Sequence, residues 1–201
     1  MEPFTIDIMG QSAAGKGTLI KRLNKFLAEK TGQRVVYAQT GDLIREFKEG
    51  PSLGARRSKE IYSKCERQPD YLAIYLWAKH INENLESEDM HLVLDGLPRS
   101  YPEAQMVKTM IIGHFQRKNP TIIHLKVSDE TATKRMLKRG RPDDTPEGIK
   151  TRLAWFWRDV IPAIDLFRND PDFRFIEIDA EQTEEKVFLD VLSELFPVVL
   201  K

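Results

Sequence analysis

Hydrophobic residues along the chain fall into five short runs that alternate with longer segments of helical periodicity. In segments 19–30, 71–85 and 185–196, apolar residues recur every three or four positions, as on one face of a helix. The short runs are typical of strands buried on both faces of a sheet. We therefore predict an α/β fold with a five-stranded parallel sheet flanked by helices. The five runs are Phe4–Met9, Arg34–Ala38, His91–Leu94, Thr121–Val127 and Phe173–Ile178.

Two connections between these runs carry more chain than a crossover needs. The segment Thr40–Glu86 follows the second run and contains enough helical sequence to form a lobe of its own. A shorter excursion, Arg139–Gly148, follows the fourth run. Both should lie at the carboxyl ends of strands, where open α/β sheets bind ligands. Asp7 interrupts the first run, and we expect it at a strand end or in a polar contact.

Composition excludes several classes of function. The 201 residues allow one domain with insertions or two small ones. Acidic and basic residues balance at 31 each, so we expect neither a nucleic-acid partner nor a membrane partner. The single cysteine, Cys65, excludes an internal disulfide and a multi-cysteine zinc site, and the four histidines lack metal-ligand spacing. Without a secretory pattern or a membrane-spanning apolar run, a cytoplasmic protein is expected.

A phosphate-binding loop follows the first predicted strand. Residues 10–18 read GQSAAGKGT, which fits the pattern G-x-x-x-x-G-K. Small residues let backbone N–H groups surround an anion, Lys16 adds a positive charge, and a helix predicted over 17–31 points its positive end at the site. The alternative is a glycine-rich turn without a ligand. The hydroxyl stands at Thr18, one place after the usual magnesium ligand, which argues against a GTPase-like switch.

Three further clusters supply arginines at the ends of later elements. TGDLIR, residues 40–45, follows the second strand, and LDGLPRS, residues 94–100, carries an acidic residue at the end of the third. RMLKRGRPDDTPEGIKTRL, residues 135–153, holds four arginines. Arginine binds phosphate through a planar fork and stays charged, so these clusters favour a site for several phosphate groups.

From the phosphate loop nearly to the C-terminus, these motifs resemble, in order, those of the adenylate kinase family of nucleoside monophosphate kinases. The resemblance implies reversible transfer of the terminal phosphoryl group of ATP to a monophosphate, most simply AMP, with Mg²⁺ as cofactor and a monomeric enzyme. It also implies a core of residues 1–39, 87–138 and 149–201, a monophosphate-binding lobe of residues 40–70 and a lid of residues 139–148. The lid is of the short type, without metal-binding cysteines.

The resemblance also implies roles for individual residues. ATP would bind at Gly10, Ala13, Ala14, Gly15, Lys16, Gly17, Thr18 and Arg135. The monophosphate would bind at Thr40, Arg45, Gln68, Gly96, Arg99 and Glu103. Lys16, Arg99, Arg139, Arg141 and Arg152 would be catalytic, and Asp95 would orient magnesium through water. Asp143 and Asp144 would pair with the lid arginines.

Phosphoryl transfer between two nucleotides explains why such a site needs cations. The acceptor phosphate oxygen is already ionised near neutral pH, so the reaction requires no general base. Catalysis then depends on in-line positioning and on neutralising charge, which lysine, arginine and magnesium provide.

Three departures from the family pattern concern the loop and the acceptor base. Ala13 stands where glycine is usual, a mild steric change. Residues 65–69 read CERQP in place of a glycine–apolar–valine–proline run. Glu103 stands where adenylate kinases carry a glutamine that binds adenine, and Gln105 lies two residues away. GMP or a pyrimidine monophosphate is therefore an alternative acceptor. A nucleotide-binding regulator without transfer activity and a plain ATPase are alternative functions.

Overall fold

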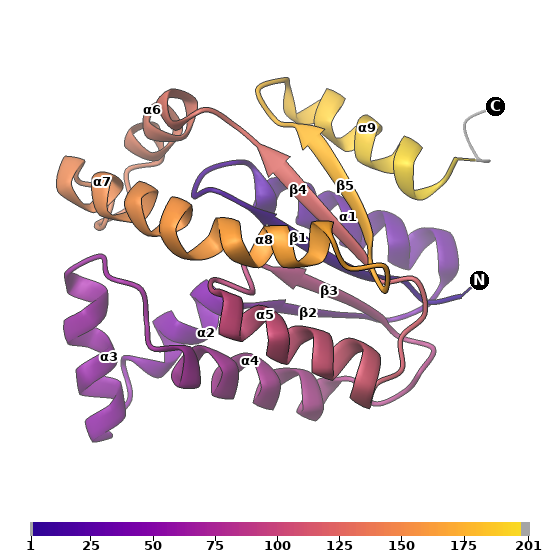
Figure 1. The fold of residues 1–201 in the computed structure, drawn as a ribbon, viewed down its shortest axis with the longest axis horizontal. Helices are drawn as coiled ribbons and strands as arrows, with labels where there is room; N and C mark the ends of the chain where they lie inside the picture. Colours follow the sequence, from indigo (N-terminus) through magenta and orange to yellow (C-terminus); the bar gives the residue numbers. More distant parts are fainter. Residues whose placement is uncertain (1, 198–201) are drawn as a thin grey trace.

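Each of the five predicted strands is present, and together they form one parallel sheet. The computed structural model describes residues 2–197; residues 1 and 198–201 of the predicted core lie outside this part. The strands follow the order β2-β3-β1-β4-β5, and every neighbouring pair is parallel (Figure 1). The predicted α/β sheet is confirmed. Its strands are β1 (Thr5–Gly10), β2 (Val35–Gln39), β3 (His91–Asp95), β4 (Thr121–Lys126) and β5 (Arg174–Asp179).

Helices cover both faces of the sheet because successive side chains of each strand point in opposite directions. Ile6 and Ile8 of β1 pack in the cluster that contains the buried residues of α1 and α9. Met9 packs in the cluster on the other face, with α4, α5 and α8. These helices are α1 (Lys16–Thr31), α4 (Asp70–Asn84), α5 (Tyr101–Lys108), α8 (Ile161–Arg168) and α9 (Glu184–Leu195).

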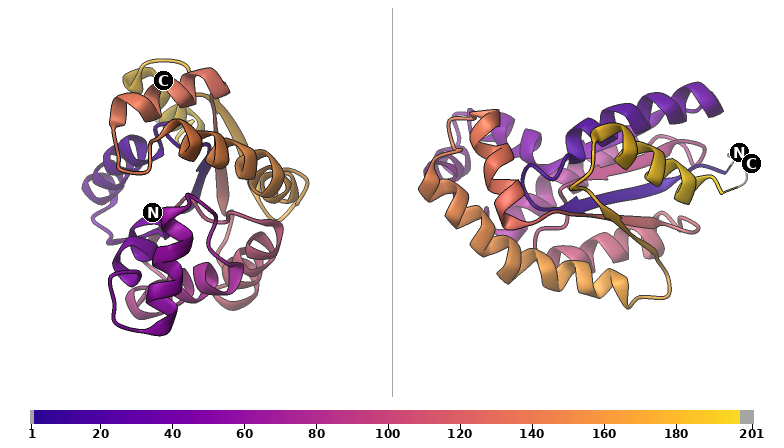
Figure 2. Two further views of the ribbon diagram at one scale, coloured as in Figure 1. Left: turned by 90° about the vertical axis from the view of Figure 1, so that its left-hand side faces the viewer. Right: turned by 90° about the horizontal axis from the view of Figure 1, so that it is seen from above.

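Apart from η1, which extends α5 toward the other end of the sheet, the remaining elements gather at the carboxyl ends of the strands, opposite the chain termini (Figure 1). Seen from this end, α3 and the α6–α7 pair lie on opposite sides (Figure 2, left). Two π-helical segments extend α5 and join α7 to α8. None of the helices within residues 2–197 is long and apolar enough to cross a membrane. The elements are α2 (Thr40–Phe47), α3 (Leu53–Ser63), η1 (Thr109–His114), α6 (Asp129–Arg139), α7 (Pro146–Trp155) and η2 (Phe156–Val160).

Strand β1 ends in a glycine for a steric reason. Gly10 has φ of 145°, and a Cβ atom there would lie 2.6 Å from the carbonyl oxygen of Leu125 in β4. The backbone therefore leaves the sheet pressed against the neighbouring strand, which only glycine allows. This close approach places the following loop directly over the carboxyl edge of the sheet.

Asp7 lies inside β1 and is 1% exposed, so the predicted strand end is wrong. Neither of its carboxyl oxygens has a hydrogen-bond partner within residues 2–197, so the predicted polar contact is absent as well. Burial, and secondarily the charge of Asp95, raise the pKa of Asp7 well above its usual value. Burial thus favours the neutral, protonated form of this carboxyl group.

We predict that neutral His124 in β4 makes stability depend on pH. The side chain is 7% exposed, and burial lowers its pKa from 6.5 to about 4, although Glu177 opposes the shift. Because the unfolded chain binds the proton more tightly, stability falls as pH drops from about 6.5 toward 4. Between pH 7 and pH 5 the loss attributable to this residue should be roughly 2 kcal/mol.

Urea unfolding at both pH values, with wild type and His124→Leu, measures this contribution. Other buried acids titrate in both proteins, so the informative quantity is the difference between wild type and variant in the free energy of unfolding lost from pH 7 to pH 5. His124→Leu should lose less stability on acidification than wild type. Equal losses in the two proteins would show that His124 already titrates normally in the fold.

Candidate active site

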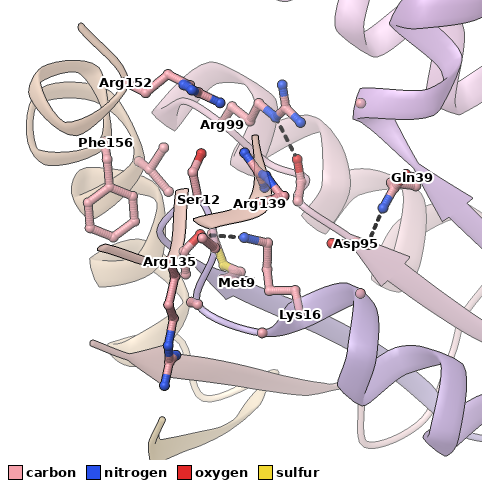
Figure 3. A pocket seen from close by; sticks show the side chains of 18 of the residues that line it. Met9, Ser12, Lys16, Gln39, Asp95, Arg99, Arg135, Arg139, Arg152 and Phe156 are labelled. Carbon is pink, nitrogen blue, oxygen red and sulfur yellow. Dashed lines mark hydrogen bonds between the residues drawn. The ribbon is translucent and has the colours of Figure 1, made fainter. Parts of the chain in front are cut away.

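A cavity of about 830 Å³ opens at the carboxyl edge of the sheet, between the phosphate loop, the α2–α3 side and the α6–α7 side (Figure 3). Thr40 and Glu103 are fully buried and do not line it. The structure brings the other predicted site residues to its wall: Gly10, Ala13, Ala14, Gly15, Lys16, Gly17, Thr18, Arg45, Gln68, Asp95, Gly96, Arg99, Arg135, Arg139, Arg141 and Arg152.

Lys16 begins α1, and its side chain folds back over the loop. Nζ donates to the carbonyl oxygens of Gly10 and Gln11, both at 2.8 Å. Burial lowers the pKa of Lys16 to about 8; Asp95 opposes this shift, and the arginines of the cavity reinforce it. The ammonium group is thus held over the loop, but its charge is not fully compensated by the protein.

Backbone conformation gives the phosphate loop its shape. Gly15 has φ of 97° and Ala13 has φ of 63°, both in the left-handed region. An alanine in this region is strained by roughly 1–2 kcal/mol, so Ala13 is more than the mild steric change that the sequence suggests. The loop therefore holds Ala13 in a conformation that glycine would adopt freely.

Asp95 ends β3 and is held by two side chains from β2. Its Oδ2 atom accepts hydrogen bonds from Tyr37 Oη at 2.8 Å and from Gln39 Nε2 at 2.6 Å (Figure 3). The sequence analysis assigned no role to Tyr37 or Gln39. Tyr37 and Gln39 are two residues apart, so both side chains lie on one face of β2. Gln39 is also paired with Asp95 across the two strands.

Arg45 of α2 and Arg99 converge over a glycine. A Cβ atom on Gly41 would lie 3.2 Å from Nη1 of Arg45 and 3.5 Å from Nη2 of Arg99. Arg99 is fixed further by donation from Nε to the carbonyl oxygen of Gly96, at 2.9 Å. The missing side chain at Gly41 thus leaves room for two guanidinium groups to face one anion.

Two arginines from the α6–α7 side share one buried carboxylate. Arg139 donates to both oxygens of Asp144, at 3.0 and 2.8 Å, and Arg152 donates to Oδ1 at 2.6 Å. Arg152 also donates to Asp143, at 3.0 Å. Burial alone would raise the pKa of Asp144, but the hydrogen bonds from Arg139 and Arg152 hold it well below its usual value. Asp143 and Asp144 thus form the ion pairs expected of them.

The other two arginines on this side are held less firmly. The Arg141 side chain has no hydrogen-bond partner in the described part of the chain, although its backbone N–H donates to Asp144. Arg135 donates from Nη2 to the carbonyl oxygen of Ala180, at 2.9 Å, which places it beside the loop after β5. Figure 3 shows Arg99, Arg139 and Arg152 above Lys16, with Arg135 set apart.

At the α3 end of the cavity, Arg67 lines the open space, whereas the sequence motifs had predicted that Glu103 would contact a ligand there. Glu103 is fully buried, and its Oε2 accepts from the backbone N–H of Arg99 at 3.3 Å. Burial raises its pKa to about 7. Arg67 lines the cavity and lies between that carboxyl group and the open space, with Nη1 3.5 Å from Glu103 Oε1. Gln105 is exposed on α5 and does not line the cavity.

Comparison with known proteins places these features in one family. The sequence model of the adenylate kinase family matches residues 8–171. An adenylate kinase of Phocaeicola vulgatus is 31% identical over 94% of this chain and 97% of its own length. Another, from a Caulobacter species (strain K31), is 32% identical over 90% of this chain and 92% of its own length. An adenylate kinase of a Cyanothece species is 30% identical, with coverages of 90% and 89%.

The matched segment begins in β1 and extends through the phosphate loop and the arginines of α2, α6 and α7. The coverage is nearly complete in both directions for each relative, so the likeness includes the whole architecture rather than the loop alone. These findings confirm the resemblance seen in the motifs: the chain belongs to the adenylate kinase family.

Proposed function

We propose that this protein reversibly transfers the terminal phosphoryl group of ATP to AMP, forming two molecules of ADP. The observation that carries the proposal is the convergence of Lys16 with seven arginines on one cavity, counted within residues 2–197. A site that only binds a nucleotide has no need for so many cations, and nor does a plain ATPase. Membership of the adenylate kinase family supports AMP, rather than GMP or a pyrimidine monophosphate, as the acceptor.

The proposed reaction requires that the protein position the two nucleotides and neutralise their negative charge. As the phosphoryl group moves, negative charge spreads over its oxygens and over the attacking and leaving oxygens. Cations already aimed at that charge stabilise the transition state without rearranging during the step. Lys16 would face the donor phosphates, while Arg139, Arg141 and Arg152 would face the group in transit.

We assign the two nucleotides to opposite ends of the cavity. ATP would occupy the phosphate loop, residues 10–18, with its base beside Arg135 and the loop after β5. The monophosphate would bind between the lobe of residues 40–70 and Arg99, with its phosphate on Arg45 and Arg99. Thr40 is buried under this end, so in this proposal it supports the wall rather than contacting the base.

The short lid of residues 139–148 would close over the donor and exclude water, which otherwise competes as acceptor. Asp144 keeps Arg139 and Arg152 together before the phosphates arrive. The segments 1–39, 87–138 and 149–201 would form the core that positions the lobe and the lid.

Magnesium fits the donor set near Asp95. Within residues 2–197, no group of three His, Cys, Asp or Glu side chains could hold a metal ion. Mg²⁺ bound with nucleotides typically uses one or two carboxylates together with phosphates and waters, so a single carboxylate is compatible with it. Tyr37 and Gln39 both bond to Oδ2 of Asp95, leaving Oδ1 for a metal-bound water. When bound, the ion would neutralise charge on the phosphates. We further propose a cytoplasmic monomer.

An acceptor panel tests the proposed reaction. ATP with Mg²⁺ is mixed with AMP, GMP, CMP or UMP, and diphosphate formation is followed in a coupled assay. Diphosphate formation that is fastest with AMP supports the proposal. ATP hydrolysis that ignores every monophosphate, or tight binding without turnover, would contradict it.

Lys16→Ala should reduce turnover by roughly 100- to 1,000-fold, since the charge contact is made in the transition state. Two loop carbonyls lose their donor, so the free energy of unfolding should fall by only about 1 kcal/mol. Lys21→Ala, on an exposed position of the same helix, is the matched control and should leave both quantities unchanged. Turnover of Lys16→Ala within a few-fold of wild type would remove Lys16 from the catalytic set.

ATP binding should draw protons from the buffer at pH 8. The pKa of Lys16 is about 8 in the free protein, so about half the molecules lack the proton at that pH. Anionic phosphates raise this pKa, and binding should therefore take up about half a proton. Calorimetry in two buffers of different ionisation enthalpy measures the uptake. If ATP binding takes up no protons at pH 8, or if the uptake is no larger at pH 9 than at pH 8, the prediction that Lys16 titrates in this range is wrong.

Asp144→Asn should lower turnover by about tenfold or more, because Arg139 and Arg152 lose the charge that holds them together. The KM for AMP should change much less, since neither arginine is assigned to the acceptor. Glu147→Gln removes an exposed charge from the same segment and serves as control. Steady-state kinetics with both substrates varied separates the two effects, and equal turnover in the two variants would contradict the role of Asp144.

A further inference from the structure

The connection between α3 and α4, residues 64–69, forms one wall of the cavity. Cys65 has φ of 56° and turns the chain, so Arg67 and Gln68 come to line the open space. If the acceptor binds as proposed above, this wall lies beside its base. The following inference rests on that placement.

Arg67 is anchored by carboxylates from three elements. Its Nε donates to Asp159 of η2 at 3.2 Å, and its Nη1 donates to Asp70 at the start of α4. Glu103 of α5 lies 3.5 Å from the same Nη1. The side chain is 19% exposed. A guanidinium group held from several directions has already lost most of its rotational freedom, so a ligand that binds it has little further entropy to remove.

One end of this guanidinium group is uncommitted. In the described part of the chain, Nη2 of Arg67 has no hydrogen-bond partner, whereas Nε and Nη1 are both engaged. Arginine offers donors and no acceptor. An N–H group beside a cavity, left without a partner in the protein, favours a ligand acceptor at that place.

The side chains next to Arg67 are less able to donate a hydrogen bond to a ring nitrogen of the base. Glu103 is fully buried and accepts the backbone N–H of Arg99. Gln68 is 5% exposed, and its amide nitrogen donates to the carbonyl oxygen of Ser58 at 3.0 Å. Their Oε1 atoms have no hydrogen-bond partner within residues 2–197, but an amide or carboxylate oxygen is an acceptor and does not supply the donor that a ring nitrogen needs.

We propose that Arg67 determines recognition of the acceptor base by donating a hydrogen bond from Nη2 to a ring nitrogen of adenine. Adenine carries lone pairs at N1, N3 and N7, and its amino group is a donor. A donor-only side chain complements the ring nitrogens and not the amino group. The positive charge strengthens the bond to about twice that of a neutral pair. Glu103 then acts through Arg67, as one of its anchors.

Binding of AMP and of its 1-deaza, 3-deaza and 7-deaza analogues tests the contact, because each analogue replaces one ring nitrogen by C–H. Dissociation constants are measured by calorimetry, so the result does not depend on turnover. Wild type should bind one of the three analogues about tenfold more weakly than AMP. In Arg67→Met that analogue and AMP should bind alike, within about twofold. The affinity for ATP should stay unchanged in both proteins.

Two further variants isolate the effect. Arg158→Met removes another arginine bound to Asp159, at an exposed position away from the cavity, and should keep the tenfold difference. Arg67→Lys keeps a positive charge among the three carboxylates but lacks Nη2, so it replaces Arg67→Met in the test if that variant unfolds. Arg67→Lys should also bind AMP and the sensitive analogue with equal affinity. If every analogue loses the same factor in wild type and in the Arg67 variants, the proposal is overturned. ADP formation from ATP and AMP, measured in parallel on wild type, tests the proposed function separately.

Discussion

Repulsion among cations is the constraint on which the rest of this site depends. Lys16, Arg99 and Arg139 share one cavity before any phosphate is present, and their mutual field helps to lower the pKa of Lys16. The protein offsets part of this repulsion with carboxylates: Asp95 opposes the shift of Lys16, and Asp144 binds two arginines at once. Phosphate groups would supply the remaining negative charge, so the excess of positive charge favours their binding.

The parallel sheet makes this concentration of charge attainable. All five strands point their carboxyl ends the same way, so the segments that follow β1, β2, β3 and β4 meet along one edge. Small residues then allow close approach. Gly10 lets the loop pass against β4, and Gly41 leaves room for Arg45 and Arg99 to meet. The cavity thus depends on the parallel direction of the strands and on glycine residues at positions where a side chain would not fit.

At the α3 end of the cavity, Arg67 lies in CERQP, where the family carries a glycine–apolar–valine–proline run, and Glu103 stands where the family carries a glutamine. Because Glu103 is buried, it needs a cationic neighbour to stay ionised, and its pKa of about 7 shows that Arg67 and Arg99 offset burial only in part. Arg67 in turn needs the carboxylates to hold it in place. The two departures, in CERQP and at Glu103, are therefore linked through Arg67, which joins α4, α5 and η2.

Strand periodicity and the G-x-x-x-x-G-K spacing are local patterns, so the sequence was enough to predict the five parallel strands and the loop that follows the first of them, but not the order of the strands in the sheet. The motifs also identified six of the arginines that line the cavity, but not Arg67. That Arg67 lines the cavity while Glu103 is buried behind it follows only from the tertiary structure. That outcome depends on contacts such as the one between Arg67 and Asp159, which are 92 positions apart. The tertiary structure likewise placed Asp7 in the interior, with no hydrogen-bond partner for its carboxyl group within residues 2–197. Local patterns carry no information about which of two neighbouring charges is buried, because burial depends on packing between elements far apart in the chain.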